Sequence, residues 1–99
     1  MINRVIVSGV LITENVEVVN NDGFTYCEFL VATQDIEKDK IRNVKLRAYG
    51  RLAYDFVKMQ NKYKTHLCMY FGELYFITRE DKTIVKINET PQVLASIGD

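Results

Sequence analysis

The clearest pattern in the chain is RNVKLRAYGRLAYDFVKMQ, residues 42–60. Up to Tyr49, apolar residues alternate with polar or basic ones, which is the period of a strand with one buried face. Beyond Gly50, apolar residues recur at helical spacing. We therefore expect a strand over Arg42–Tyr49 and then a short helix from about Arg51 to Gln60. The expected core residues of this segment are Val44, Leu46, Ala48, Leu52, Phe56, Met59 and Tyr63.

Most of the remaining chain also has the composition of strands. Strands are expected over Val5–Ile12, from Thr25 to the charged stretch that begins at Asp35, over Leu67–Ile77 and over Thr83–Asn88. Cys27, Phe29 and Val31 share the apolar side of the second of these. Asn20–Gly23 and Arg79–Lys82 are turn signals, and a last apolar piece is Val93–Ile97. Gly9 and Gly72 fall inside strands, where glycine marks a bulge or bend.

Three strands, a helix and two further strands are the element order of an OB fold, with other small barrels as alternatives. We predict an all-β protein: a five-stranded OB-fold Greek-key barrel with one short helix between strands 3 and 4. The 99 residues, 47% hydrophobic with one proline, fit a single OB-fold domain over residues 1–99.

Cysteine and histidine usage argues against several classes of site. Cys27 and Cys68 are too few for a disulfide scaffold and lack the close spacing of a zinc or redox motif. His66 is the only histidine, and the sequence shows no carboxylate pair or phosphate loop. We expect no enzyme activity, hence no catalytic residues, no metal and no cofactor. No run approaches a membrane span and no leader is recognisable, so we expect a cytoplasmic protein without a membrane partner.

The charged residues are balanced in number but not in position. The chain has thirteen basic and thirteen acidic residues, and a neutral chain lacks long-range attraction for polyanions. Residues 38–64, however, hold nine basic and two acidic side chains, whereas residues 1–37 hold one basic and six acidic side chains. This clustering predicts a positive surface on one side of the barrel, as in a polyanion-binding protein. The alternative is that Lys58, Lys62 and Lys64 are merely solvated.

Lys45, Arg47 and Tyr49 share the polar face of the expected strand, at intervals of about 6.6–7 Å. This is close to the repeat of an extended single-stranded nucleic acid, which proteins hold with cations along the phosphates and aromatic rings against the bases. We therefore predict single-strand binding on this face. The alternative for Tyr49 is packing at the strand end against the helix.

Four segments carry a family resemblance: NRVIVSGVL (3–11), FLVAT (29–33), VKLRAYGRLA (44–53) and YFGEL (70–74). In this order they resemble the bacterial single-stranded DNA-binding proteins. The resemblance implies an OB fold that binds single-stranded DNA without strong sequence specificity, as a homodimer or homotetramer, in replication, repair or recombination. It leaves open RNA as a ligand and the number of subunits.

The chain stops at Ser96-Ile97-Gly98-Asp99, whereas typical members of the family continue into a disordered linker and an acidic tip. In this respect it is similar to a tail-less relative, primosomal replication protein N, and short organellar or phage-type relatives fit as well. The likeness implies replication-restart proteins as further partners.

The resemblance also implies site residues. Tyr49 falls on a base-stacking aromatic of the family, and Lys45 on a basic residue of the same face. The family often has aromatics where this chain has Glu37, Asn43 and Arg79, and the chain contains no tryptophan. We therefore expect weaker stacking and a larger electrostatic share of the affinity. The predicted nucleic-acid-binding residues are Arg4, Lys45, Arg47, Tyr49, Arg51, Tyr75 and Arg79.

Two aromatics near the last turn are candidates to replace the missing ones. Tyr75 is expected to offer a stacking platform, whereas Phe76 is expected to be buried within the hairpin.

The segment from residue 67 to 71 is apolar on both faces, which a strand in a single-layer barrel does not need. Cys68 and Tyr70 lie on one face. The other face, formed by Leu67, Met69 and Phe71, is predicted to be part of a subunit interface together with the first strand.

The main alternative function is an OB-fold protein-interaction module, primosome-type or an organellar or phage accessory factor, with weak or no nucleic-acid binding. The neutral charge and the missing tryptophans favour this alternative.

Overall fold

The computed structural model describes residues 1–34, 37 and 40–97. Its elements, in chain order, are β1 (Val5–Leu11), β2 (Val19–Asn21), β3 (Phe24–Gln34), β4 (Ile41–Tyr49), α1 (Arg51–Lys64), β5 (His66–Ile77), the 3₁₀ turn η1 (Thr78–Glu80), β6 (Lys82–Ile87) and β7 (Gln92–Ser96).

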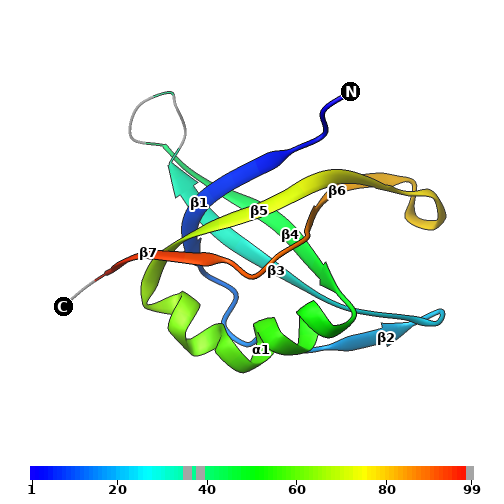
Figure 1. The fold of residues 1–99 in the computed structure, drawn as a ribbon, viewed down its shortest axis with the longest axis horizontal. Coiled ribbons are helices and arrows are strands. Elements are labelled where there is room, and N and C mark those ends of the chain that lie inside the picture. Colours follow the sequence, from blue (N-terminus) through cyan, green and yellow to red (C-terminus); the bar gives the residue numbers. More distant parts are fainter. Residues whose placement is uncertain (35–36, 38–39, 98–99) are drawn as a thin grey trace.

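Five of the strands close into a barrel. β1, β3, β4, β6 and β5 are neighbours in that order, and a pairing between β1 and β5 closes the ring. β4 and β6 are parallel, and the other pairs in the ring are antiparallel. This is the OB fold predicted from the sequence, with α1 between the third and fourth barrel strands. The helix lies across one end of the barrel (Figure 1).

Two edge strands outside the ring are absent from the sequence prediction. β2 overlaps the segment predicted as a turn, Asn20–Gly23, and pairs with β3, so the turn itself is narrower, at Asp22 and Gly23, with φ of 51° and 79°. β7 pairs with β5, so the last apolar piece extends the sheet. A three-residue strand such as β2 is too short to show the alternation from which strands are predicted.

The predicted inward faces of β3 and β4 are confirmed. Cys27, Phe29 and Val31 of β3 and Leu46 and Ala48 of β4 are all buried. They form one core with the buried face of α1, where the Phe56 ring stacks on Phe29 with centroids 4.0 Å apart.

The helix differs from its prediction in two respects. It runs to Lys64 instead of ending near Gln60, because no helix breaker precedes Thr65, whose N–H is bonded to the carbonyl of Lys62 at 3.1 Å. Met59 is 41% exposed, so its prediction as a core residue is wrong, and Ala53 is buried in α1 along with Phe56 and Tyr63.

Two glycines lie where neighbouring barrel strands approach each other closely. A Cβ at Gly9 would overlap the carbonyl oxygen of Ala32 on β3, and one at Gly72 would overlap that of Lys86 on β6. Gly50 has a φ of 62° and joins β4 directly to α1, its N–H bonded to the carbonyl of Thr25 at 2.8 Å. Residues with a side chain rarely adopt this conformation.

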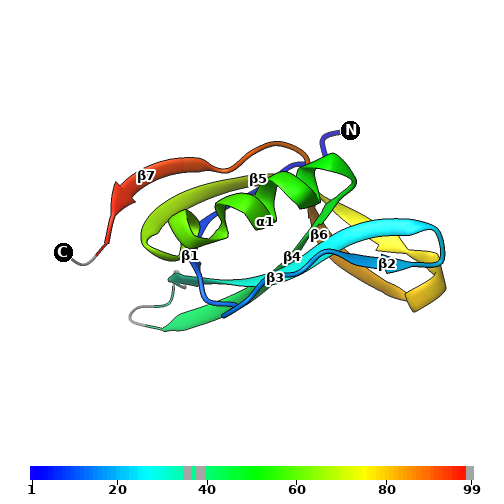
Figure 2. The same cartoon turned by 90° about the horizontal axis from the view of Figure 1, so that it is seen from below.

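Two hairpins project beyond the barrel on the same side (Figure 2). We call them arm 1, the β2–β3 hairpin with its turn at Asp22–Gly23, and arm 2, the β5–β6 hairpin with η1 at its tip. The predicted charged turn at residues 79–82 thus includes a 3₁₀ turn that closes at Asp81 in the left-handed conformation. β4 ends at Tyr49, beside both arms.

No helix in the described part of the chain is long and apolar enough to cross a membrane; α1 has 14 residues.

Candidate nucleic-acid interface

Tyr49 is the centre of a cluster of aromatic rings contributed by β4 and both arms. Its ring centroid lies 5.6 Å from that of Tyr26 and 6.5 Å from that of Phe24, both on arm 1. On arm 2, the ring of Tyr75 lies 6.0 Å away in an edge arrangement. These separations are typical of interacting aromatic pairs. The end of the basic strand is therefore surrounded by rings from segments far apart in the sequence.

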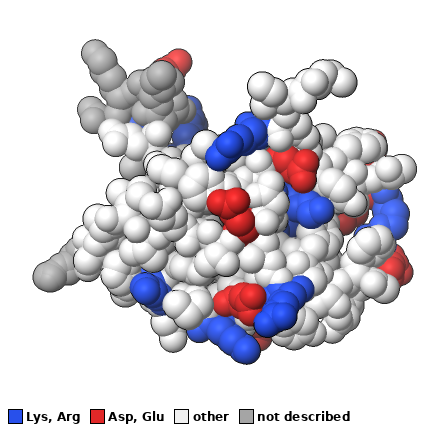
Figure 3. Space-filling view, in the orientation of Figure 1, with Lys and Arg blue, Asp and Glu red and all other residues white. Residues whose placement is uncertain are grey.

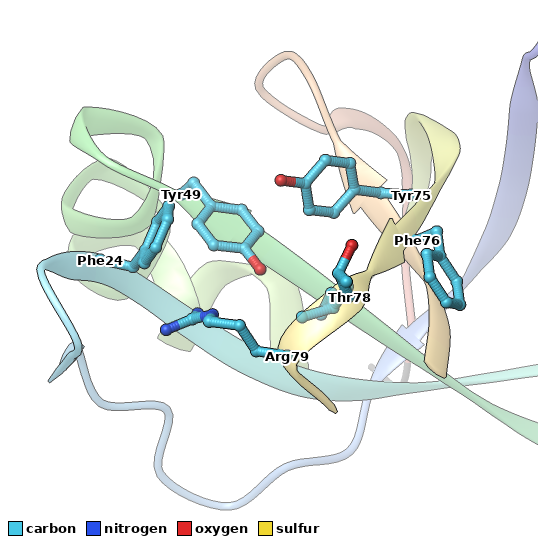
Figure 4. Close-up of a pocket in the computed structure, with 7 residues that line it drawn as sticks. Phe24, Tyr49, Tyr75, Phe76, Thr78 and Arg79 are labelled. Carbon is cyan, nitrogen blue, oxygen red and sulfur yellow. The ribbon is translucent and has the colours of Figure 1, made fainter. Parts of the chain in front are cut away.

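The rings surround a hollow of about 220 Å³. We call this the aromatic hollow; it is lined by Phe24, Tyr49, Tyr75, Phe76, Ile77, Thr78 and Arg79. Figure 4 shows Tyr49 and Tyr75 facing each other across it, with Arg79 reaching toward Phe24. Phe24 is 45% exposed and Tyr75 is 38% exposed, so aromatic surface is accessible to a ligand.

Phe76 does not have the burial predicted for it. It is 56% exposed, because arm 2 extends past the barrel and leaves this side of the hairpin uncovered.

Two cations lie against the rings of the hollow. The ammonium nitrogen of Lys86 is 5.0 Å from the Tyr75 ring centroid and 5.7 Å from that of Tyr49. The Arg79 guanidinium carbon is 4.4 Å from the Phe24 centroid. Both are cation–π distances. Among the described residues, no carboxylate lies within ion-pair distance of Lys86, so its charge is available for an anion.

Arg47 differs from the expectation for the basic face. It belongs to the outward face of β4, yet its side chain is only 3% exposed. Its guanidinium donates to Glu28 and Glu80 and contacts the Tyr26 ring at 4.3 Å. Burial opposes the charged form, but the hydrogen bonds to Glu80, Tyr49 and Glu28 outweigh it and raise the pKa of Arg47. Arg47, which we expected to be a free cation, is thus buried and paired, because the tip of arm 2 covers it.

The carboxylate of Glu80 bridges two cations. Arg47 bonds it at 2.9 and 3.0 Å, and Lys82 lies 3.1 Å away. Hydrogen bonds from Arg47 and Lys82 lower the pKa of Glu80 to about 2. Glu28 similarly lies 2.7 Å from Arg47 and 3.7 Å from Lys45. Acidic residues therefore neutralise part of the positive charge that the sequence places here.

The other predicted cations are spread more widely. Lys45 is 53% exposed on β4, and Arg51 is exposed at the first position of α1. Arg4 lines a different hollow, of about 260 Å³, with Asn3, Phe71, Gly72, Asn88 and Glu89. The structure thus brings Tyr49, Tyr75 and Arg79 together, places Lys45 and Arg51 on the adjoining elements, and puts Arg4 elsewhere. Their role in binding stays a prediction.

The basic segment of the sequence is divided between two parts of the fold. Lys58 and Lys62 are exposed on α1 at the end of the barrel, whereas Lys45 lies in the wall. Lys38 lies outside the described residues. On the face drawn in Figure 3, basic and acidic side chains are interspersed around a broad uncharged area.

Sequence reasoning missed Phe24, Tyr26 and Lys86. The signal for the first two is present, because they continue the period of Glu28 on the outward face of β3. Lys86 gives no such signal, since its place beside Tyr49 depends on the parallel pairing of β4 with β6.

The thiols show no sign of reactivity. Burial raises the pKa of Cys27 to about 11 and also raises that of Cys68, so both stay protonated. Within the described residues no three His, Cys, Asp or Glu side chains gather as metal ligands would.

Leu67, Met69 and Phe71 are half-buried on the outward face of β5. Met69 pairs with Ser8 and Phe71 with Ile6 of β1, and Ile6 is 51% exposed. β7 lies on the other side of β5, with Ala95 opposite Leu67. The predicted interface residues and the first strand thus share one partly apolar face.

Several solved structures have a fold similar to that of this chain. The chain has the OB fold of single-stranded DNA-binding proteins. It is similar to the dimeric N-terminal domain of PriB from Thermoanaerobacter tencongensis, with 18% identity, a TM-score of 0.70 and coverage of 95% of this chain and 98% of that chain. Comparison with family profiles and with curated sequences finds no match.

Two further similar structures are named as single-stranded DNA-binding proteins. A small one from Mycoplasma pneumoniae has 21% identity and a TM-score of 0.59, covering 100% of this chain and 92% of that chain. The mitochondrial protein Rim1 from S. cerevisiae has 9% identity and a TM-score of 0.71, covering 95% of each chain. At these identities the likeness establishes the fold.

Proposed function

We propose that this protein binds single-stranded DNA across the aromatic hollow and performs no catalytic step. The observation that carries the proposal is the grouping of Tyr49, Tyr75 and Phe24 around one accessible hollow, with Lys86 and Arg79 against the rings. A base stacked on an aromatic ring contributes about 1–3 kcal/mol, and every base offers such a face. Binding is therefore expected to be largely independent of sequence.

In this proposal the bases stack between the arms and the phosphates follow the cations around the hollow. Lys86 and Arg79 hold the strand at the hollow, and Lys45 and Arg51 extend its path along β4 and the start of α1. Acidic residues lie among these cations. We therefore expect modest affinity that falls steeply with salt.

We further propose a homo-oligomer, a dimer or a tetramer, joined through the face formed by β1 and β5. Its role would be in DNA replication, repair or replication restart in the cytoplasm, with replication-restart proteins as further partners. The dimeric PriB domain with the same fold supports the homo-oligomer. RNA is a second ligand to be compared with DNA.

The test is fluorescence anisotropy of a labelled oligo-dT of about 16 nucleotides, the upper site size of one OB fold. The parent is expected to bind at about 50 mM salt, with a log–log slope near −0.7 for each phosphate contact. Replacing Tyr49 with alanine should weaken binding about 5- to 150-fold, the scale of one stacked base. Tyr54, 49% exposed on α1, gives the matched control Tyr54→Ala, which should leave binding unchanged.

Absence of binding by the parent at about 50 mM salt would instead favour an OB-fold module that recognises protein. Equal losses in the two tyrosine variants would place the site elsewhere on the molecule.

A further inference from the structure

Arg47 uses most of its hydrogen-bonding capacity inside the protein. Its Nε donates to Glu28 at 2.7 Å, and its two terminal nitrogens donate to Glu80 at 2.9 and 3.0 Å. One of these nitrogens also donates to the hydroxyl oxygen of Tyr49 at 3.1 Å. A guanidinium has five N–H donors in a rigid planar fork. Four bonds therefore fix both the position and the plane of this group.

These bonds connect three separate segments. Glu28 lies on β3, Arg47 on β4, and Glu80 in η1 at the tip of arm 2. The pairing of Arg47 with Glu80 spans 33 residues and holds the tip of arm 2 over the wall of the barrel. Tyr75 and Arg79 line the aromatic hollow from the same arm, so this pairing also bears on where that side of the hollow lies.

A phosphate has little access to this guanidinium. The side chain is 3% exposed, and Tyr26 covers one face of it. Releasing Arg47 to a ligand would break its bonds to Glu28 and Glu80, and it would leave these carboxylates with one lysine each, Lys45 at 3.7 Å and Lys82 at 3.1 Å. The neighbouring Lys86 and Lys45 are better placed to meet phosphate, because Lys86 lies against the rings of Tyr75 and Tyr49 and Lys45 is half exposed.

We infer that Arg47 is a positioning residue that holds the Tyr49 ring and the tip of arm 2 in place for stacking, and that it is not a phosphate-binding cation. The inference rests on the proposed single-strand binding at the aromatic hollow. Tyr49 is held at its ring by Tyr26, Phe24 and Tyr75 and at its hydroxyl by Arg47. A ring fixed before binding loses less rotational freedom when a base stacks on it.

The decisive variant is Glu80→Gln, because the two roles predict effects of opposite sign. If Arg47 positions Tyr49, loss of this carboxylate loosens the arm and weakens oligo-dT binding about three- to tenfold, the scale of one weakened charge-assisted hydrogen bond. The salt slope stays that of the parent, since no phosphate contact is lost. If Arg47 instead binds phosphate, removing a competing negative charge strengthens binding. An affinity equal to or above that of the parent overturns the inference.

Glu73→Gln is the matched control. Glu73 lies opposite Lys86 in the pairing of β5 with β6, so the substitution removes a negative charge near the same site without touching Arg47. Its affinity for oligo-dT should equal or exceed that of the parent. A loss as large as that of Glu80→Gln would attribute both effects to general disturbance of arm 2 and overturn the inference.

A readout without ligand separates this inference from the proposed function. The ring resonances of Tyr49 in an NMR spectrum should shift in Glu80→Gln, while those of Tyr54 on α1 stay in place. If the parent fails to bind oligo-dT but the Tyr49 resonances shift, the proposed ligand is wrong and the positioning contact stands. Unshifted Tyr49 resonances overturn the positioning role itself.

Discussion

Arg79 and Asp22 join the tips of the two arms. The guanidinium Nη1 of Arg79 lies 3.0 Å from the carboxylate Oδ2 of Asp22, although the two residues are 57 positions apart. The same guanidinium lies over the ring of Phe24. Asp22 is 73% exposed, so the pair contributes little to stability. The pair matters for binding, because the carboxylate of Asp22 competes with the phosphates of the proposed ligand for the guanidinium of Arg79.

Asp22→Asn should therefore strengthen oligo-dT binding about two- to fivefold at about 50 mM salt, with the gain shrinking as salt rises. Asparagine tolerates the left-handed backbone of this turn, and the free energy of unfolding should change by less than about 1 kcal/mol. Anisotropy titrations of parent and variant measure the effect. Asp55→Asn removes an exposed carboxylate on α1 and should change the affinity less. Weaker binding by Asp22→Asn would mean that Asp22 orients Arg79 for the ligand.

The barrel can be predicted from this sequence because each of its strands has a local signal, a run of apolar residues or an alternation of apolar and polar ones. Alternation shows which side of β4 faces the core, but it does not show what covers the other side. Arg47 therefore looks like an exposed cation until Glu80, from a distant turn, is found against it. The exposure of Phe76 depends in the same way on how far arm 2 extends beyond the barrel. Both errors concern contacts between segments far apart in the chain.

The close approach of β5 to β6 can be tested at Gly72. A Cβ there would overlap the backbone carbonyl of Lys86, which cannot move without disturbing the sheet. Gly72→Ala should lower the free energy of unfolding by about 2–3 kcal/mol, the cost of forcing atoms into a packed site. Gly23→Ala is the comparison, because Gly23 has open space around it but a φ of 79°, which costs about 1–2 kcal/mol. Urea denaturation measures both, and a smaller loss for Gly72→Ala would contradict the close contact.

The pairing of Glu80 with Arg47 predicts how stability depends on pH. The carboxyl of Glu80 has a pKa of about 2 in the folded protein, below its ordinary value of 4.5. As the pH falls, Glu80 is therefore protonated in the unfolded chain before it is protonated in the folded protein. Its contribution to the free energy of unfolding is complete above pH 4.5 and is lost as the pH falls toward 2. In thermal unfolding, the parent should have a higher Tm than Glu80→Gln at neutral pH. The difference should narrow over this acid range, and a constant difference would contradict the lowered pKa.

The shared face of β1 and β5 predicts that the protein self-associates. Met69 is half-buried there, near the exposed Ile6, and burying a charge in an apolar interface is unfavourable. Met69→Glu should weaken the oligomer at least about tenfold, on the scale of an interface hot spot. Met59, 41% exposed on α1, supplies the matched control Met59→Glu, which should leave assembly intact. Light scattering at micromolar concentration measures the mass, and a parent that is monomeric at 11.5 kDa would rule out this interface.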